Sequence, residues 1–272
     1  TPLYSSAASD VYKRQIYARE YDAAISPNGN IPVHAFNLIS PTFFANSSTG
    51  NKYSLWVNVY GVSERYLNVY GEKDLRAQMN QFFHRTYTHP VDGTTLDMKM
   101  LCNWYWYDET AILETGKGTK DWNFYRYAET LLSAAEAIAQ SSGVNAEAAG
   151  YLAQVKARAN MEGKDVSTIA SELQRLGKQA FIEECWKERL REFPLEMKIW
   201  DDCVRTGKFP QISATNKGEV QFVDLIGATN GSGAKFKETD LYWPIPVNEI
   251  QRNPNLTQNE GCLLYTSDAA DE

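Results

Sequence analysis

Cysteine and histidine, the residues that most often bind metals or act as nucleophiles, do not stand at productive spacings in this chain. The sequence holds four cysteines and three histidines. They are Cys102, Cys185, Cys203, Cys262, His34, His84 and His89. Because no CxxC or HxxxH pair occurs, we expect no zinc site, no disulfide framework and no cofactor. Cys185 and Cys203 are expected to be small buried residues on helices.

Aromatic side chains are densest in the segment WYWYDE, residues 104–109. The four rings belong to Trp104, Tyr105, Trp106 and Tyr107. If this segment is a β-strand, alternation places the two tryptophans on one side and the two tyrosines on the other. One pair could then contact a ligand while the other packs inward, or all four rings could fill the core. Asn103 and Asp108 are the adjacent polar side chains.

Three zones that differ in composition must position these residues. Residues 16–121 are rich in Asn, Gly, Ser and Thr, which predicts irregular structure with a few short helices, while segments such as 53–61 could be strands or extended loops. Residues 122–209 carry apolar side chains at three- and four-residue steps, which predicts helices. Residues 210–261 predict loops and then an extended strap that packs along the helices, because prolines and asparagines crowd it. We expect 16–261 to form one domain.

Helical hairpins are expected in the middle zone. A helix over 124–140 should end near Gly143, and Asn145 should cap the next helix over 146–160. Further helices are predicted over 168–176 and 178–193, and Pro194 should interrupt the chain before a last helical segment within 195–209. Successive helix pairs build tetratricopeptide-like solenoids. The predicted fold class is mainly α, with helical hairpins, extensive irregular loops and few short strands.

Both ends of the sequence look foreign to the rest. Residues 5–15, SSAASDVYKRQ, resemble a translated sequencing adapter, and residues 262–272, CLLYTSDAADE, resemble the same adapter on the opposite strand. We therefore expect 1–15 and 262–272 to be adapter-derived. The natural part, 16–261, is expected to be a metagenomic fragment of a longer gene that lacks its amino-terminal part.

Charge argues against nucleic acid as a partner. The whole chain has 27 basic and 34 acidic residues and a net charge of −7. Without the foreign ends, 25 basic and 30 acidic residues remain, a net charge of −5. Non-specific phosphate binding needs clustered Lys and Arg instead. No apolar run approaches the roughly 20 residues that a membrane-spanning helix needs.

The carboxyl-terminal strap, LYWPIPVNEIQRNPNLTQNEG, resembles the closing signature of the SusD/RagB family of outer-membrane nutrient-binding lipoproteins. Residues 125–137, 155–160 and 188–209 resemble further blocks of that family. The matching framework residues include Arg126, Glu129, Glu188, Arg189, Glu192, Trp200, Asp202, Pro244, Pro246, Asn253, Pro254 and Asn255. Met197 stands where the family usually has Gly, and Ile199 where it usually has Arg. The charged members are expected to form ion pairs that register packed helices.

The resemblance implies a non-catalytic, surface-exposed lipoprotein of Bacteroidota-type bacteria that captures a glycan for polysaccharide utilisation. Its implied partners are the glycan, a SusC-like TonB-dependent transporter, and the outer membrane through a lipid anchor outside this fragment. Sugar binding uses flat aromatic faces together with amide and carboxylate groups. The candidate ligand residues are Trp56, Tyr60, Tyr66, Asn103, Trp104, Tyr105, Trp106, Tyr107 and Asp108.

Two alternatives remain open at this point. A helical-repeat scaffold could present a concave helix face to a peptide or protein. A glycoside hydrolase would need two carboxylates about 5 or 6.5–9.5 Å apart across an aromatic cleft. The spatial arrangement of the aromatic and acidic side chains separates these alternatives.

Overall fold

The computed structural model describes residues 15–22, 62–88, 93–108 and 120–261. The chain divides into two compact units. The first comprises Thr1–Ile199 and Ile212–Val220, and the second comprises Trp200–Gln211 and Gln221–Glu272. The expectation of one domain over 16–261 therefore stays a prediction.

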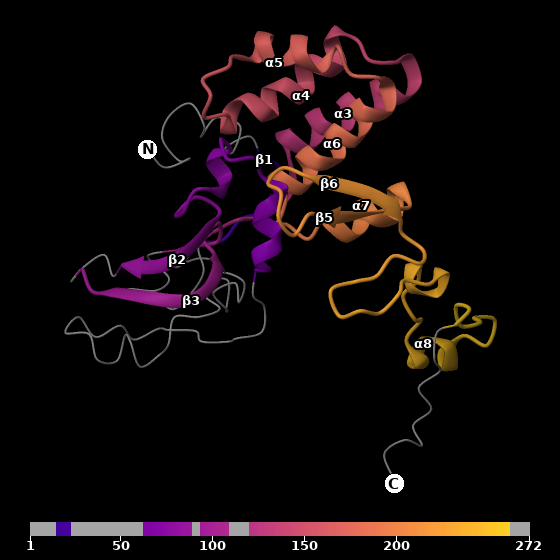
Figure 1. The fold of residues 1–272 in the computed structure, drawn as a ribbon. Coiled ribbons are helices and arrows are strands. Elements are labelled where there is room, and N and C mark those ends of the chain that lie inside the picture. The colour runs from indigo at the N-terminus through magenta and orange to yellow at the C-terminus, as the bar shows by residue number, and fades with distance from the viewer. Residues whose placement is uncertain (1–14, 23–61, 89–92, 109–119, 262–272) are drawn as a thin grey trace. The chain divides into compact units, whose positions relative to one another are not determined.

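Helices α3 (Tyr127–Ser142) and α4 (Ala146–Ala159) form the predicted hairpin, next to each other in Figure 1. Gly143 ends α3 with φ +80°, a conformation that a residue with a Cβ rarely adopts. The Asn145 side chain then accepts a hydrogen bond from the Ala148 N–H at 2.9 Å and caps α4. Both boundary predictions are confirmed to within a few residues.

Helices α5 (Val166–Leu173) and α6 (Lys178–Glu192) continue the array. α3 packs against α4 and α6, while α4 also packs against α5. The Asp165 side chain caps α5 by accepting from the Thr168 N–H at 2.8 Å. Predicted helices at 168–176 and 178–193 are thus confirmed, with the first shifted by two or three residues.

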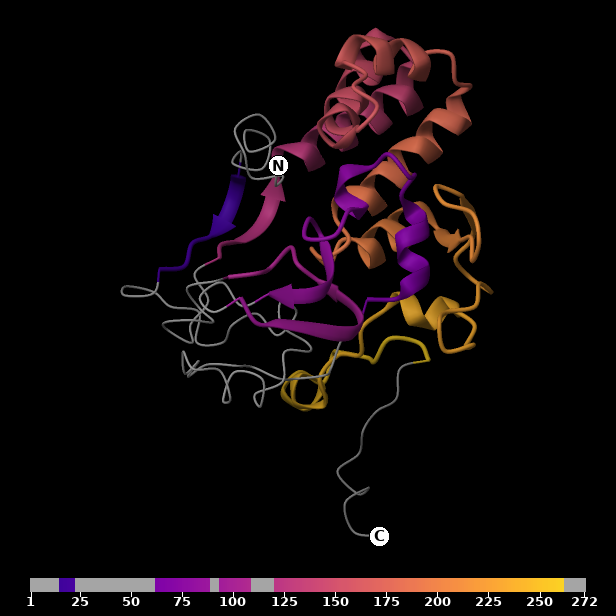
Figure 2. The ribbon, with the colours of Figure 1, turned by 60° about the vertical axis from the view of Figure 1, so that its left-hand side comes forward.

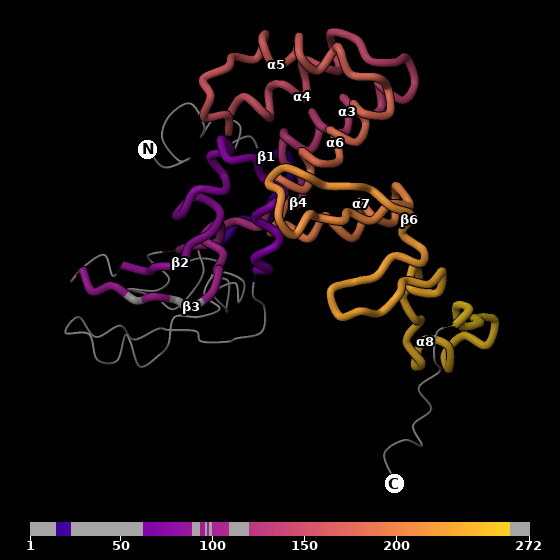
Figure 3. Tube along the Cα trace, in the orientation of Figure 1, coloured from indigo at the N-terminus to yellow at the C-terminus, as the bar shows by residue number. Residues whose placement is uncertain are grey.

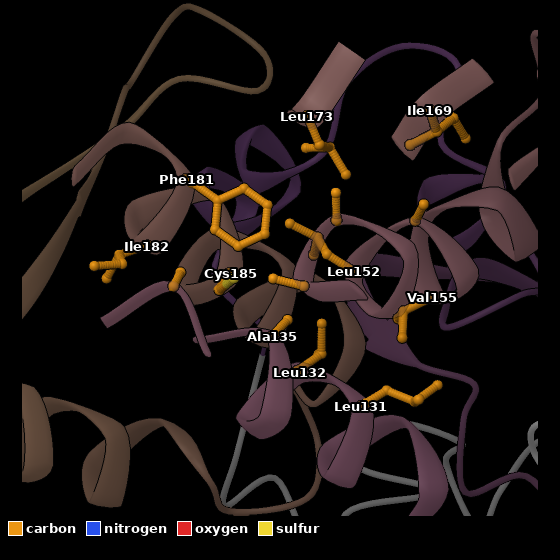
Figure 4. Packing of buried hydrophobic residues seen from close by; sticks show 14 of the residues in the cluster. Leu131, Leu132, Ala135, Leu152, Val155, Ile169, Leu173, Phe181, Ile182 and Cys185 are labelled. Atoms are coloured by element: carbon orange, nitrogen blue, oxygen red, sulfur yellow. The ribbon is translucent and has the colours of Figure 1, made fainter. Parts of the chain in front are cut away.

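A buried apolar cluster joins these four helices (Figure 4). Leu132 of α3, Leu152 of α4 and Phe181 of α6 are fully buried within it. Each such side chain contributes about 1.5–3 kcal/mol through its burial. Cys185 lies in the same cluster, and both Cys185 and Cys203 are buried free thiols, which confirms their predicted role as small apolar residues.

Two antiparallel strand pairs belong to the first unit (Figure 2). β1 (Gln15–Arg19) pairs with β4 (Trp122–Arg126), which leads directly into α3. β2 (Phe83–Thr88) pairs with β3 (Thr95–Asn103). Short 3-10 helices, η1 (Glu64–Val69) and η2 (Leu75–Ala77), precede β2. Residues 74–83 form η2 and then the approach to β2.

The prediction of loops over 210–240 is wrong in part. After α7 (Ile199–Thr206), strands β5 (Lys208–Ile212) and β6 (Val220–Asp224) pair with each other, followed by η4 (Glu238–Leu241). The trace in Figure 3 can be followed from α7 to β6 and on to the loop after it. Gly218, at φ +78°, supplies the left-handed turn residue between the strands. Segments as short as these strands carry too little period to be recognised in a Gly-rich sequence.

The strap is not extended throughout, so that prediction is also wrong in part. Residues Val247–Arg252 form the short helix α8 between Pro246 and Asn253. Pro246 is compatible with this position because the first helical turn needs no backbone donor there. Gln258 fastens the segment before α8 by donating to and accepting from the Ile245 backbone at 2.9 and 2.8 Å. Packing of the strap along the helices stays a prediction.

The described residues are mainly helical with few short strands, which confirms the predicted fold class. None of their helices has both the length and the apolar character needed to cross a membrane.

Candidate functional site

The four-ring segment is a turn and not a strand. β3 ends at Asn103, the Trp104 N–H donates to the Phe82 carbonyl at 2.7 Å, and the Tyr107 N–H donates back to the Trp104 carbonyl at 3.0 Å. A turn brings residues i and i+3 to the same side. The predicted alternation of tryptophans against tyrosines is therefore wrong, because the chain reverses where the aromatic run begins.

Trp104 and Tyr107 stack on each other, with ring centroids 4.0 Å apart and planes 10° from parallel. Both side chains are half-buried. The His84 ring lies 4.8 Å from that of Trp104, and Tyr87 lies 6.4 Å from Trp104 and 6.1 Å from Tyr107. We call His84, Tyr87, Trp104 and Tyr107 the aromatic cluster. Strand β2 contributes two of its rings, and the turn after β3 contributes the other two.

Tyr105 and Trp106 point the other way and are only 3% and 2% exposed. The Tyr105 hydroxyl donates to Glu196 Oε1 at 3.2 Å, and the Trp106 indole N–H donates to the Leu195 carbonyl at 3.0 Å. These contacts fix the turn against the residues that follow α6. Among the sequence candidates, these two rings position the site and do not present a surface.

The polar candidates beside the turn are largely buried. Asn103 is 6% exposed and Asp108 is 5% exposed. The Lys120 ammonium, which the sequence analysis did not single out, donates to the Tyr105 carbonyl at 2.6 Å. Burial lowers the pKa of Lys120 to about 8, against the opposing effect of Asp108. The spacing of 15 residues between Lys120 and Tyr105 gave no sequence signal for this contact.

The remaining candidate ligand residues either make other contacts, away from the aromatic cluster, or lie outside the described residues. The Tyr66 hydroxyl donates to the Leu190 carbonyl on α6 at 2.7 Å, so Tyr66 ties η1 to the helices. Trp56 and Tyr60 lie outside the described residues.

His84 is the buried titratable member of the aromatic cluster. It is 2% exposed, and its Nδ1 has no hydrogen-bond partner among the described residues. Burial lowers its pKa to about 4, so the imidazole is neutral at physiological pH. Within the described part of the chain, no group of three or more His, Cys, Asp or Glu side chains is arranged to hold a metal ion.

A buried ion-pair network lies between the helices and the strands. Its members are Asp74, Arg76, Arg126, Lys156, Arg158, Glu184, Glu188, Arg191, Glu192 and Glu196. Glu192 is its centre: the carboxylate accepts from Arg76 and Arg126, each at 3.0 Å, and also pairs with Arg158. Burial alone would raise the pKa of Glu192, but the three guanidinium groups outweigh burial and lower it to about 2.

The framework charges from the sequence analysis lie inside or beside this network. Arg126 holds Glu196 through three hydrogen bonds of 2.6 to 3.1 Å. Arg189 and Lys198 both reach Glu129, at 3.4 and 3.1 Å. In the second unit, Asp202 pairs with Arg205 at 3.2 Å, and the Trp200 ring lies 5.6 Å from Phe236. Sequence reasoning missed Arg191 and Glu184, whose positions gave no signal beyond helical spacing.

A separate pocket of about 470 Å³ opens between the 71–76 loop and the ends of α4 and α5. Lys73, Asp74, Asn160 and Lys164 are among its lining residues. Its charged walls are mostly paired internally, as in the contact of Lys164 with Glu172 at 3.0 Å. No candidate ligand residue from the sequence lines it.

Stacked helical hairpins beside a small strand pair define a mainly helical protein with few short strands. The family model of the SusD family matches residues 45–261. The chain therefore belongs to the SusD family, which confirms the resemblance seen in its motifs.

Individual relatives agree with this assignment. The starch-binding protein SusD of Bacteroides thetaiotaomicron is 35% identical over 137 residues, which are 50% of this chain and 21% of that protein. A SusD superfamily protein from Parabacteroides distasonis matches with a TM-score of 0.74 and 27% identity over 92% of this chain and 50% of that one.

The fold is shared more widely still. The surface glycan-binding protein A of Bacteroides uniformis matches with a TM-score of 0.60 and 19% identity, over 94% of this chain and 51% of that one. This chain thus spans about half the length of the solved structures it matches, and about a fifth of the curated SusD sequence.

Proposed function

We propose that this protein binds an oligosaccharide or polysaccharide without catalysis, through the aromatic cluster. The observation that carries the proposal is the half-buried Trp104–Tyr107 stack at the end of the β2–β3 hairpin. Aromatic faces bind the apolar side of a pyranose ring, and rigid rings lose little conformational entropy when they do so. The stack is held by buried contacts below it, so its geometry exists before the ligand arrives.

Relatives support the glycan as the ligand class. The Bacteroides thetaiotaomicron relative is named a starch-binding protein. A surface glycan-binding protein A of the same organism, similar in fold at a TM-score of 0.59 and 18% identity, has been solved with laminarihexaose. We carry over to this chain the class of ligand and not either glycan.

The acidic side chains support binding over hydrolysis. A glycosidase needs one carboxylic acid that holds a proton near neutral pH. Glu188 and Glu192 are fully buried and paired with arginines, and the pKa of Glu192 is lowered to about 2. Glu192 held in this state stays ionised near neutral pH and cannot act as the proton donor.

The cellular role is part of the same proposal. Family membership supports a protein exposed at the outer membrane that delivers its glycan to a SusC-like TonB-dependent transporter. In that role the protein is attached to the membrane through a lipid anchor at its amino terminus.

Affinity gel electrophoresis of the full-length protein tests the site. Trp104→Ala and Tyr107→Ala should each weaken retention by a neutral polysaccharide about tenfold, because each removes one ring of the stack. Trp243→Ala is the matched control, since that ring is 82% exposed and lies outside the cluster. Trp106→Ala is unsuitable because its ring is buried.

Unchanged retention of both site variants would contradict the proposal. The peptide-scaffold alternative gives a different result, because a peptide on the concave helix face would bind equally well to the Trp104→Ala protein.

A further inference from the structure

One face of the β1–β4 pair carries a second set of exposed rings. Arg19 lies directly opposite Trp122 in the register, and Phe124 follows Trp122 at the two-residue step that keeps side chains on one face. The strands are irregular around Tyr17, whose ring stacks on Phe124 with centroids 5.1 Å apart and planes 27° from parallel. We call Tyr17, Arg19, Trp122 and Phe124 the β1–β4 row.

The row is unusually exposed for its composition. Tyr17 is 60% exposed and Phe124 is 40% exposed, while Trp122 is half-buried. The neighbouring Tyr125 is 54% exposed, but the Lys198 ammonium covers its ring at 4.8 Å. Adjacent exposed apolar side chains are costly in water and mark contact surfaces.

The row is joined through buried rings to the turn that carries the proposed glycan site. Trp122 stacks on Trp106 with centroids 4.9 Å apart and planes 6° from parallel. Trp106 in turn meets Tyr105 edge-on at 5.0 Å. Both belong to the turn that presents Trp104 and Tyr107. The turn that carries Trp104 and Tyr107 therefore contacts β4 at Trp122, and Phe124 stands roughly 7 Å further along β4.

The makeup of the row favours a sugar chain over a protein core as its occupant. Core faces of strands are mostly aliphatic and buried. Here three aromatic rings share one face with Arg19, whose guanidinium lies 5.3 Å from the Tyr21 ring and offers several donors. Ring faces beside the N–H donors of a guanidinium match the alternating apolar faces and hydroxyls of a polysaccharide.

We propose that the β1–β4 row is a second contact surface for the same glycan, so that the preferred ligand is a chain of several sugar units that reaches from the Trp104–Tyr107 stack to the Tyr17–Phe124 stack. This inference rests on the proposed function. Two linked contacts raise the affinity for a long chain because the second contact forms at a high effective concentration. A short oligosaccharide gains nothing from the row, since it can occupy only one stack.

Chain length is the variable that tests the row. In the full-length protein, binding of a trisaccharide and of the parent polysaccharide is measured by calorimetry and by affinity gels. Tyr17→Ala and Phe124→Ala should weaken polysaccharide binding at least about tenfold and leave trisaccharide binding within about twofold. Tyr125→Ala, which removes an exposed ring of the same strand from beneath Lys198, is the matched control and should change neither.

The outcomes separate this inference from the proposed function. If Tyr17→Ala and Phe124→Ala retain the polysaccharide as the wild type does while Trp104→Ala loses retention, the β1–β4 row is not a contact surface. The glycan site at the Trp104–Tyr107 stack is then still supported. If the two row variants and also Trp104→Ala and Tyr107→Ala retain the polysaccharide as the wild type does, the proposed glycan site itself is wrong. A fall in melting temperature with equal loss for both ligands shows that the row packs against the protein's own chain, and a change in sedimentation shows that it packs against a second copy; either overturns the row.

Discussion

At the scale of single residues, the most informative feature is the balance of the buried ion-pair network. Its five basic and five acidic side chains neutralise each other. Removing such groups from water is costly, and attraction between them roughly offsets that cost when every partner is present. The network therefore specifies how α6 meets the strands more than it adds net stability. Removing one member leaves the buried charges of its partners without compensation.

Glu192→Gln tests this balance. Three guanidinium groups lose their shared carboxylate, so the free energy of unfolding should fall by about 3–5 kcal/mol in urea titrations followed by circular dichroism. Glu64→Gln is the control, because it breaks an exposed pair with Arg85 and should cost less than about 1 kcal/mol. Equal losses for the two variants would contradict the role assigned to the network.

His84 predicts how stability depends on pH. The unfolded chain takes up a proton near the ordinary pKa of 6.5, whereas burial lowers the pKa of His84 to about 4 in the fold. The stabilisation is complete above pH 6.5 and is lost as the pH falls toward 4. Between pH 7 and pH 5 this loss amounts to roughly 2 kcal/mol.

His84→Phe should flatten this part of the stability profile. Glu184 and Glu192, whose pKa values are lowered to about 2, lose their contribution only below about pH 4.5, so they do not obscure this window. Denaturation midpoints at pH 5, 6 and 7 measure the effect. Identical profiles for the variant and the wild type would show that His84 does not titrate as described.

At the scale of elements, the turn between α6 and α7 carries local strain. Met197 has φ +58°, a left-handed conformation that costs a side-chain-bearing residue about 1–2 kcal/mol. The resemblance placed a glycine at this position in the family. Because Met197 is also 63% exposed, little packing would be lost by removing its side chain.

Met197→Gly should therefore raise the free energy of unfolding by roughly 0.5–1 kcal/mol, after the added entropy of the unfolded glycine is counted. Thermal unfolding measures the change, and Met161→Gly, at an exposed position without positive φ, should instead destabilise. A lower melting temperature for Met197→Gly would mean that the methionine makes contacts worth more than its strain.

The sequence predicted the helices whose apolar side chains repeat at a helical period and whose ends carry capping residues. Gly143 and Asn145 bound α3 and α4 because each has a local physical role that needs no partner elsewhere. Sequence could not define the turn at 104–107, where a backbone bond to Phe82 decides the geometry. It singled out the four rings as one group, but which two of them are buried depends on contacts with Leu195 and Glu196, about ninety residues away.

At the scale of the whole molecule, the net charge predicts that the protein does not bind nucleic acids. With a net charge of −7, the chain as a whole repels phosphate backbones, whose binding depends on clustered basic side chains that release counterions. Electrophoretic mobility-shift assays with duplex DNA at 50 mM salt should show no complex. Binding that weakens steeply with added salt would contradict this expectation and point to a basic patch outside the described residues.

The ion-pair network also has a consequence for biosynthesis. Arg76 and Arg126 leave the ribosome long before their carboxylate partners on α6, since Arg76 precedes Glu188 by 112 residues and Arg126 precedes Glu192 by 66. Until α6 is complete, those cations have only Asp74 among their network partners. Contacts this distant in sequence slow folding. A nascent chain that stops short of α6 therefore lacks Glu188 and Glu192 for Arg76, and Arg126 gains its full set of partners only after Glu196 is synthesised.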